Sequence, residues 1–418
     1  MPKPTSKLYV RVNLSKIRDI DRAIAMLGER NITAKRGLTE DSIYLEYEAH
    51  SADLDRFESS QSGIIIHARA GEAALIGHNI MRSYLSVKPN LPEGLIDRIP
   101  VFVQVNRVVA ESQRCYECHR RKSELGIELK VGSHRHVVAL CSRNLNYSDD
   151  TSDGNWKDPI FRNDLPRYKF PAIVKGSYFE IQTFPSLITS RLLAPEPGQT
   201  VIDACAGPGR KSMHIAELMK RSGKLYAFEI DYRRKALILE RARRFVIDTN
   251  NFMIVKELDA SDERAVERVL NGKKADSILI DPPCTSLGTR PKIFEPAIPK
   301  WKYIEVKHVQ RNILNTLSKF LKKGGRLVYS TCTLNQAENE MQIERFLREK
   351  GGEFVLEEPK ISGVDIKSYL SKTEGLCKNK ALKFLPKVHD SIGYFVAVLR
   401  KEEKPHASTR GSSRHWPR

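Results

Sequence analysis

Residues 200–211 read Thr200-Val201-Ile202-Asp203-Ala204-Cys205-Ala206-Gly207-Pro208-Gly209-Arg210-Lys211. The first four residues form an apolar run that predicts a buried strand, and the apolar positions between Met213 and Met219 predict a helix after it. A strand, a glycine-bearing turn and a helix in this order are typical of a doubly wound α/β fold, in which the turn approaches a nucleotide-like ligand. Gly207 and Gly209 leave that approach free of side chains.

Two acidic residues follow at the ends of further predicted strands. Glu229 closes the run 224–229, where a carboxylate can accept hydrogen bonds from ribose hydroxyls. Asp259 follows the run 252–255 and is placed to receive an adenine amino group. The turn itself matches neither the dinucleotide pattern nor the ATP-binding pattern. The turn and the two acids in this order therefore indicate S-adenosylmethionine.

Two cysteines lie at the ends of two more predicted strands. Cys284 follows the run 277–280 in Asp281-Pro282-Pro283-Cys284, and Cys332 follows the run 326–329 in Ser330-Thr331-Cys332-Thr333. Because ligands bind beyond the carboxyl ends of parallel strands, we expect both thiols to face one crevice. A thiolate is a strong nucleophile, so the pair favours covalent chemistry. The alternative is two buried, inert cysteines or a disulfide.

These segments resemble the Sun/RsmB-type RNA cytosine-5 methyltransferases. The resemblance covers roughly Leu165 to Arg400, and it departs from the family pattern at Arg210, where a second glycine is usual, and at Thr285-Ser286, where a small residue and a glycine are usual. Further matching segments are Gln182, Ser186-Leu187, Gly288-Thr289-Arg290, Trp301, Gln310, Leu314, Lys323-Gly324-Gly325, Glu338-Asn339-Glu340, Phe384-Leu385-Pro386, His389-Asp390 and Gly393-Tyr394-Phe395.

The resemblance implies methyl transfer from S-adenosylmethionine to carbon 5 of a cytidine. It implies that Cys332 adds to carbon 6 and that Cys284 assists release of the product. Asp281 would hydrogen-bond to or protonate ring nitrogen 3, and Lys211 would lower a thiol pKa or hold substrate. No metal is implied. The implied cofactor-binding residues are Ala204, Cys205, Ala206, Gly207, Pro208, Gly209, Arg210, Lys211, Glu229, Arg234, Asp259 and Asp281.

The charge of the chain favours an RNA partner. Its 418 residues carry a formal net charge of +19, and such a field attracts polyanions. Basic residues cluster at Arg233-Arg234-Lys235 and recur at Arg241, Arg243 and Arg244 along one predicted helix, although a basic helix face is often only solvated. No signal peptide or membrane span is recognisable, so we expect a cytoplasmic monomer with free thiols.

The N-terminal third predicts two further domains. Residues 1–60 predict an α+β unit with a strand at 8–12, a helix at 17–27 and a strand at 42–47. Residues 61–148 are β-rich, with runs at 64–68, 100–105, 108–110, 126–131 and 137–140 that predict strands, and residues 146–155 predict a linker. The segment 69–77 resembles the opening of a PUA domain, a small RNA-binding pseudo-barrel. Residues 149–400 would form the Rossmann-like α/β methyltransferase domain, and residues 401–418 a disordered basic tail. The PUA resemblance points to the tRNA-acting subgroup and to a target near the acceptor end.

Several alternatives remain open. Ribosomal RNA is the rival substrate, and a non-catalytic RNA-binding assembly factor is the rival function. Cys115 and Cys118, with three histidines and Cys141 nearby, lack the second ligand pair that a zinc site of usual spacing needs. Glu338 and Asn339 are interpreted as structural, because such residues commonly begin a helix and cap it.

Overall fold

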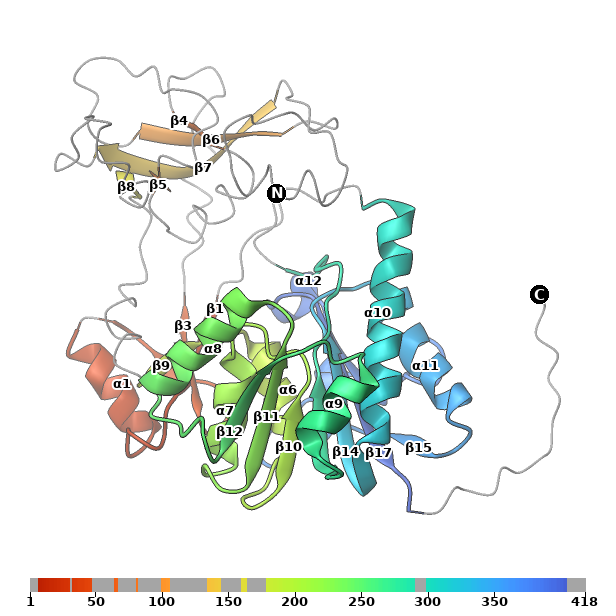
Figure 1. The fold of residues 1–418 in the computed structure, drawn as a ribbon. Coiled ribbons are helices and arrows are strands. Elements are labelled where there is room, and N and C mark those ends of the chain that lie inside the picture. The colour runs from red at the N-terminus through yellow and green to blue at the C-terminus, as the bar shows by residue number, and fades with distance from the viewer. Residues whose placement is uncertain are drawn as a thin grey trace. The chain divides into compact units, whose positions relative to one another are not determined.

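The computed structural model describes residues 7–30, 32–46, 178–289 and 298–403, together with the backbone of five strands between residues 64 and 163 (Figure 1). The chain divides into two compact units. The larger unit comprises Tyr9–Leu45, Val174–Thr289 and Tyr303–Arg418, and the smaller comprises Met1–Leu8, Glu46–Ile173 and Arg290–Lys302.

A mixed eight-stranded sheet forms the centre of the larger unit. Its strand order is β12-β11-β10-β13-β14-β17-β15, and β16 also pairs with β17. The first five strands in this order are parallel, whereas β17 runs antiparallel to β14, β15 and β16. The strands are β10 Thr200–Asp203, β11 Lys224–Glu229, β12 Met253–Glu257, β13 Ala275–Ile280, β14 Leu321–Thr331, β15 Phe354–Glu357, β16 Ala381–Phe384 and β17 Tyr394–Lys401.

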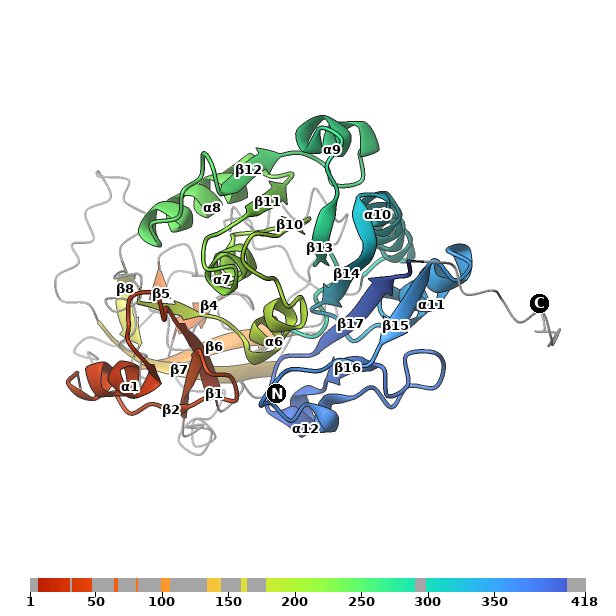
Figure 2. The same cartoon turned by 90° about the horizontal axis from the view of Figure 1, so that it is seen from below.

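Helices cover both faces of this sheet (Figure 2), so the predicted α/β architecture is confirmed. Runs such as the one in β13 are apolar on both faces because both faces are buried. One face packs against α6 Phe184–Leu192, α7 Arg210–Leu218 and α8 Tyr232–Arg244. The other packs against α9 Glu263–Leu270, α10 Lys300–Lys319 and α11 Glu340–Glu349. Short helices are η3 Gln336–Glu338, η4 Lys367–Tyr369 and α12 Pro386–His389.

The N-terminal strands form a second sheet that includes a strand from much later in the chain. Its order is β2-β3-β1-β9, built from β1 Lys7–Val12, β2 Lys35–Arg36, β3 Ser42–Glu46 and β9 Phe179–Ile181. The helix expected at 17–27 is α1 Ile20–Gly28, which begins later because Asp19 accepts a hydrogen bond from the Arg22 amide as its N-cap. The sheet therefore joins the N-terminal segment to the chain entering the central domain.

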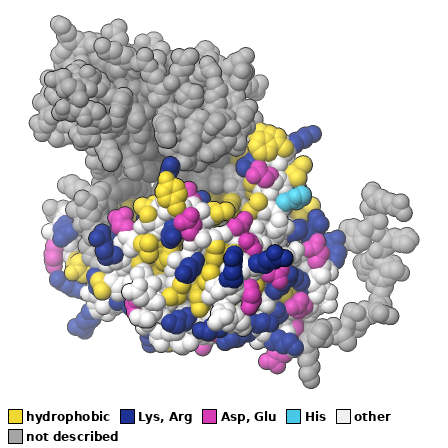
Figure 3. Space-filling model, viewed as in Figure 1, with side chains coloured by type: hydrophobic (Ala, Val, Ile, Leu, Met, Phe, Trp, Pro, Cys, Tyr) yellow, Lys and Arg dark blue, Asp and Glu magenta, His cyan; other side chains and the backbone are white. Residues whose placement is uncertain are grey.

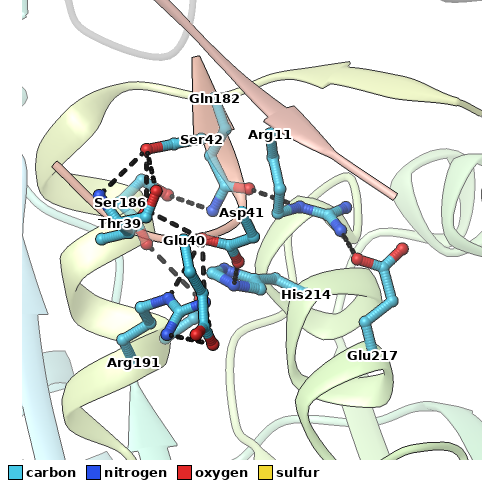
Figure 4. Close-up of polar contacts among 11 residues, drawn as sticks. Arg11, Thr39, Glu40, Asp41, Ser42, Gln182, Ser186, Arg191, His214 and Glu217 are labelled. Carbon is cyan, nitrogen blue, oxygen red and sulfur yellow. Dashed lines mark hydrogen bonds and ion pairs between the residues drawn. The ribbon is translucent and has the colours of Figure 1, made fainter. Parts of the chain in front are cut away.

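A buried polar network attaches the N-terminal sheet to α6 and α7 (Figure 4). Asp41 contacts His214 Nε2 at 2.7 Å and accepts a hydrogen bond from Arg191 Nε at 3.1 Å. Burial lowers the pKa of His214 to about 4, so the imidazole is neutral at pH 7. Burial alone would raise the pKa of Asp41, but His214 and Arg191 hold it well below its usual range. The negative charge of Asp41 is thus balanced by the Arg191 guanidinium.

A second branch of the network centres on Arg11, whose side chain is fully buried. Its guanidinium donates to Gln182 Oε1 at 3.2 Å and forms an ion pair with Glu217 on α7. Gln182 in turn donates to Ser186 Oγ at 3.1 Å, at the start of α6. Both branches end on α7, the helix that begins with Arg210 and Lys211, so the N-terminal sheet supports the helix that follows the glycine turn.

The smaller unit contains a five-stranded sheet with the order β4-β6-β7-β8-β5. The strand predicted at 64–68 is described over residues 64–66 as β4, and the strands predicted at 100–105 and 137–140 lie within β6 and β7. β8 lies beyond residue 148, where the β-rich domain was predicted to end, and it extends that sheet to Asn163 by pairing with β7. The strands are β4 Ile64–Ile66, β5 Ile80–Met81, β6 Ile99–Val105, β7 His134–Arg143 and β8 Pro159–Asn163.

The last strand of the central sheet enters the segment that was predicted to be a disordered tail. Lys401 ends β17, and its Nζ donates to the Ser318 carbonyl oxygen at 2.9 Å and lies 3.1 Å from a Glu353 carboxylate oxygen. These contacts and the pairing with β15 hold Lys401 in the sheet. Among the helices that the structure describes, none is both long and apolar enough to cross a membrane.

We predict that Asp41→Asn lowers the free energy of unfolding by about 3 kcal/mol, because it leaves the largely buried Arg191 guanidinium beside a neutral amide. The matched control is Glu40→Gln, which removes a carboxylate that is 77% exposed and bonded to the same arginine. It should cost less than about 1 kcal/mol. Equilibrium urea unfolding measures both, and equal effects would contradict the importance of the buried pair.

Candidate active site

The register of three parallel strands brings their carboxyl ends to one edge of the sheet. Asp203 at the end of β10 pairs with Leu279 of β13, and Ile280 at the end of β13 pairs with Tyr329 of β14. The glycine turn, the loop 281–289 and the segment after β14 therefore begin side by side. This is the edge where open α/β sheets bind ligands.

The two predicted thiols meet at this edge. Cys284 Sγ and Cys332 Sγ lie 3.3 Å apart, and both are half-buried free cysteines. The alternative of a disulfide is therefore wrong for this structure. Neither thiol is sealed in the core, so the alternative of inert buried cysteines is also disfavoured.

The two sulfurs differ in how readily they ionise. The hydrogen bond with Cys284 lowers the pKa of Cys332, and a hydrogen bond with Ser286 acts in the same direction against burial. The same contact with Cys332, together with burial, raises the pKa of Cys284 well above its usual value. Since the thiolate is the reactive form, this difference favours the prediction that Cys332 is the nucleophile of the pair.

Asp281 is held from both sides. Its Oδ2 forms an ion pair with Lys211 Nζ. Its Oδ1 accepts hydrogen bonds from Ser330 Oγ at 2.9 Å and from Tyr394 OH at 3.2 Å. Burial alone would lower the pKa of Lys211, but the Asp281 carboxylate raises it above the ordinary lysine value. The pair is thus a fixed ammonium and carboxylate beside the thiols.

A buried carboxylate ties the loop of Cys284 to the segment after Cys332. Glu338 accepts from the Thr285 amide at 2.9 Å and from Thr285 Oγ1 at 2.6 Å. It also accepts from Gln310 Nε2 and Asn335 Nδ2, each at 3.1 Å. All of these donors converge on a side chain that is fully buried. The structural interpretation of Glu338 is therefore supported, but it positions the site rather than capping a helix.

Asn339 does not act as the cap that its sequence position predicts. It occupies the N-cap of α11, yet its side chain makes no capping hydrogen bond. Instead its Nδ2 donates to the Thr333 carbonyl oxygen at 3.0 Å, and its Oδ1 accepts from Thr331 Oγ1. The amide consequently bonds to the residue on either side of Cys332, to the side chain of Thr331 and to the backbone of Thr333.

Close backbone contact fixes the far end of the thiol loop. The Gly288 amide donates to the Cys332 carbonyl oxygen at 2.9 Å, and the Gly393 amide donates to the Gly288 carbonyl oxygen at 2.7 Å. A Cβ on Gly288 would lie 2.0 Å from the Gly393 carbonyl oxygen, so only glycine fits there.

The predicted cofactor turn has the open backbone that its sequence indicates. Gly207 has φ +56°, and a Cβ added to it would have no atom within 4 Å. Gly209 has φ +87°, and its own added Cβ would meet Ile238 of α8 at 3.2 Å. The turn is anchored by the Ala204 and Ala206 amides, which donate to strand carbonyl oxygens of β13 and β11 at 2.9 Å. The space over Gly207 therefore suits a ligand that approaches the backbone.

The two predicted cofactor acids differ in setting. Glu229 is buried, accepts from the Asp231 amide at 2.9 Å and lies 3.4 Å from Arg234 Nε. Asp259 is exposed, and its Oδ1 accepts from the amide and hydroxyl of Ser261 at 2.8 and 2.7 Å. Both acids lie at or just after the carboxyl ends of strands, at the edge of the sheet where the site is. Arg234, the predicted cofactor-binding arginine, forms an ion pair with Glu229.

Asp203 is a further acid beside the turn. Burial raises its pKa to about 6, and it accepts a hydrogen bond from Ser212 Oγ at 2.6 Å. Burial also raises the pKa of Cys205 well above its usual value, so this third thiol stays protonated.

Two arginines of the predicted basic cluster, Arg241 and Arg244, and the turn residue Arg210 have an internal partner. The buried Glu180 of β9 forms ion pairs with Arg210, Arg241 and Arg244. The Arg210 side chain, the departure from the family pattern, thus points at Glu180 from the first position of α7. On the face seen in Figure 3, Lys and Arg side chains are spread out with acidic side chains between them.

No group of His, Cys, Asp and Glu within the described part of the chain is arranged to hold a metal ion. The structure does not describe the side chains of Cys115, Cys118, Cys141 and the histidines near them. The predicted strands at 108–110 and 126–131 and the predicted linker at 146–155 also lie outside the described residues.

Residues 190–400 match the family model described as 16S rRNA methyltransferase RsmB/F. The chain belongs to this family. It is 36% identical over 243 residues to a tRNA (cytosine(72)-C(5))-methyltransferase of Pyrococcus horikoshii, covering 57% of each chain. It is 33% identical over 243 residues to a probable ribosomal RNA small subunit methyltransferase B of Bacillus subtilis, covering 55% of this chain and 50% of that protein. The chain thus spans about half the length of these relatives.

The similarity extends further in three dimensions. The crystal structure of NSun6 from Pyrococcus horikoshii with SFG aligns with a TM-score of 0.74 and 25% identity, covering 96% of this chain and 92% of that one. The central domain therefore has the Rossmann-like fold of the S-adenosylmethionine-dependent methyltransferases, with a mixed central sheet.

Sequence reasoning found the thiols, Asp281 and Lys211, and the structure brings all four together. The hydrogen bonds of Ser330 and Tyr394 to Asp281 were not predicted, because nothing in the sequence shows that these residues contact Asp281. The one available signal was that both residues lie in segments that match the family, near Cys332 and next to Gly393.

We predict that Glu338→Gln loosens the site, because the amide nitrogen of glutamine would face donors that now meet a carboxylate. The free energy of unfolding should fall by about 2–3 kcal/mol. The matched control is Glu349→Gln on α11, an exposed ion-pair partner of Arg345 that should cost less than about 1 kcal/mol. Urea unfolding measures stability, and diamide-driven disulfide formation between Cys284 and Cys332 measures their proximity. A normal disulfide yield in Glu338→Gln would show that Glu338 does not position the thiols.

Proposed function

We propose that this protein methylates carbon 5 of a cytidine in tRNA, near the acceptor end, with S-adenosylmethionine as methyl donor. The observation that carries the proposal is the pair of unlike thiols, 3.3 Å apart, beside the ion pair of Asp281 and Lys211. Carbon 5 of cytosine is a poor nucleophile until a thiolate adds to carbon 6. A site with one thiol of lowered pKa and a neighbouring carboxyl group suits that chemistry.

The residues at the glycine turn fit the proposed cofactor. The backbone of Ala204 to Lys211 would hold it over Gly207, where the space next to the backbone is open. Glu229 would accept its ribose hydroxyls, and Asp259 its adenine amino group. Arg234 would act by orienting Glu229, which it contacts. When bound, S-adenosylmethionine supplies an electrophilic methyl group.

Cys332 is the proposed nucleophile. Its thiolate would form the bond to carbon 6 of the cytosine ring, and the displaced π electrons would move through the ring toward nitrogen 3. Cys332 is the thiol whose pKa is lowered, through its hydrogen bonds with Cys284 and Ser286. The Lys211 ammonium adds a smaller effect in the same direction.

Asp281 and Lys211 would stabilise the ring as electron density reaches nitrogen 3. A carboxyl at this position can accept from the exocyclic amino group and share a proton with nitrogen 3, and the Lys211 ammonium holds the carboxyl in place. Ser330 and Tyr394 would hold the carboxylate in place while this occurs. Preorganised groups of this kind cost no reorganisation during the reaction.

Cys284 would assist release. Its pKa is raised, so it enters the reaction as a thiol. After it has given its own proton to water, its thiolate would accept the carbon 5 proton, directly or through a water molecule, as the bond between Cys332 and carbon 6 breaks. The electron pair of that bond returns to Cys332.

The choice of tRNA rests on relatives and on the smaller unit. Two relatives are named tRNA (cytosine(72)-C(5))-methyltransferases, from Pyrococcus horikoshii and, at 28% identity over 303 residues, from Mus musculus. We interpret residues 61–148, with β8 added, as a PUA-like domain that grips RNA. The net charge of +19 supports a polyanionic substrate. We retain the expectation of a cytoplasmic monomer.

Ribosomal RNA remains the second candidate substrate, because a family relative from Bacillus subtilis is named for it. An assembly factor without activity is the remaining alternative. A thermal-shift measurement with S-adenosylmethionine distinguishes an assembly factor from a methyltransferase, since a ligand that binds the native state must raise the melting temperature. An unchanged melting temperature at saturating S-adenosylmethionine would favour the assembly factor.

We predict that the protein transfers label from S-adenosylmethionine to unmodified tRNA, and that digestion yields 5-methylcytidine. Cys332→Ala should reduce the rate to below roughly one-thousandth, as removal of a covalent nucleophile does. Cys377→Ala, at a buried cysteine outside the site, is the control and should retain activity.

The same assay run with rRNA tests the substrate. 5-Methylcytidine formed only on rRNA would keep the chemistry and overturn the choice of tRNA. No product on either RNA would contradict the proposed function.

A further inference from the structure

Ser286 occupies a backbone conformation that favours glycine. Its φ is +55°, in the left-handed region, at the position where the family pattern expects a glycine. The conformation is held by Thr289, whose hydroxyl and amide donate to the Ser286 carbonyl oxygen at 2.9 and 3.3 Å. Strained residues of this kind persist where the surroundings over-determine them, often at functional sites.

The Ser286 hydroxyl lies beside both sulfurs. Its Oγ is 3.4 Å from Cys332 Sγ and 3.8 Å from Cys284 Sγ. The shorter contact is to the proposed nucleophile. A hydroxyl is a stronger hydrogen-bond donor than the Cys284 thiol, and it can donate to a thiolate without itself changing charge.

We infer that Ser286 is a further catalytic residue of this protein, whose hydroxyl donates a hydrogen bond to the Cys332 thiolate and thereby selects which thiol ionises. The inference rests on the proposed function, because it assumes that Cys332 is the nucleophile. When Cys332 ionises, its proton passes to water and Ser286 keeps its own. The hydroxyl turns from accepting a bond from the thiol to donating one to the thiolate.

The other groups around Cys332 act in both directions. From the loop 281–289, Cys284 stabilises the thiolate and Asp281 opposes it. From α7, Lys211 stabilises it, and from β17, Tyr394 lies near enough to interact with it. Because Lys211 is already paired with Asp281, the two charges largely offset each other, and the hydrogen bonds from Cys284 and Ser286 decide the balance.

The loop geometry makes this hydroxyl difficult to replace from elsewhere. Thr285 on one side of Ser286 is bonded to Glu338, and Gly288 on the other is bonded to the Cys332 backbone. A segment that is fixed at both ends therefore places the Ser286 Cβ next to the two sulfurs. A residue without a hydroxyl at 286 would leave the loop in place and remove only the donor.

The test is the pH dependence of Cys332 alkylation by iodoacetamide, followed on the full chain by peptide mass spectrometry. The variants are Ser286→Ala, which removes the hydroxyl, and Ser286→Gly, which also relieves the left-handed backbone and so should fold at least as well as the parent. The control is Asn379→Gly, at another non-glycine residue with φ +57°. Its side chain accepts a hydrogen bond from Lys372.

Both Ser286 variants should move the Cys332 profile up by about one pH unit and slow its alkylation at pH 7 about tenfold. The Asn379→Gly profile should superimpose on that of the parent. The pH profile of kcat should move with the alkylation profile in the Ser286 variants. An unchanged Cys332 profile in both Ser286 variants would overturn the inference, as would a parent protein in which Cys284 alkylates at lower pH than Cys332.

This experiment separates the inference from the proposed function. Alkylation is measured without RNA or S-adenosylmethionine, so a shifted profile supports the role of Ser286 in ionisation whatever the substrate. Absence of methyl transfer by the parent protein would overturn the proposed function and with it the term catalytic for Ser286.

Discussion

The parallel register of β10, β13 and β14 is the constraint on which the site depends. Each strand contributes one functional segment at its carboxyl end, and the pairing of Ile280 with Tyr329 sets where the two thiol-bearing segments begin. The apolar core on both faces of the sheet fixes this register, because a slip of one residue would turn buried side chains toward the opposite face. The distance between the two sulfurs is therefore a consequence of packing far from either thiol.

Polar contacts then position the side chains within the site that the sheet brings together. Glu338 joins the two thiol segments, and Asp281 joins the ion pair with Lys211 to donors from β14 and β17. The N-terminal sheet supports the same assembly through His214 and Glu217 on α7, the helix that carries Lys211. The result is one site whose charges are paired, and in which hydrogen bonds decide which of two adjacent thiols ionises.

Much of this was predictable from local sequence. The strands at 200–203 and 224–229 have the predicted bounds. The thiols and Asp281 meet as their positions after strand ends imply, and Lys211 joins them from the first turn of α7. The addition of β9 to the N-terminal sheet was not predictable, because its partner lies far away in the chain and β9 has only three residues. The roles of Glu338 and Asn339 were also hidden, since a helix-start pattern does not reveal a buried partner. Arg241 and Arg244 looked like RNA ligands because Glu180 is distant in sequence.

The central claim is that Cys332 attacks and Cys284 releases. Its most direct test is a denaturing gel of each single alanine variant after incubation with labelled tRNA and S-adenosylmethionine. Cys284→Ala should accumulate a protein covalently linked to RNA, because addition proceeds and release is impaired. Cys332→Ala should form no such species. A covalent species with Cys332→Ala, and none with Cys284→Ala, would contradict the account and exchange the roles of the two thiols.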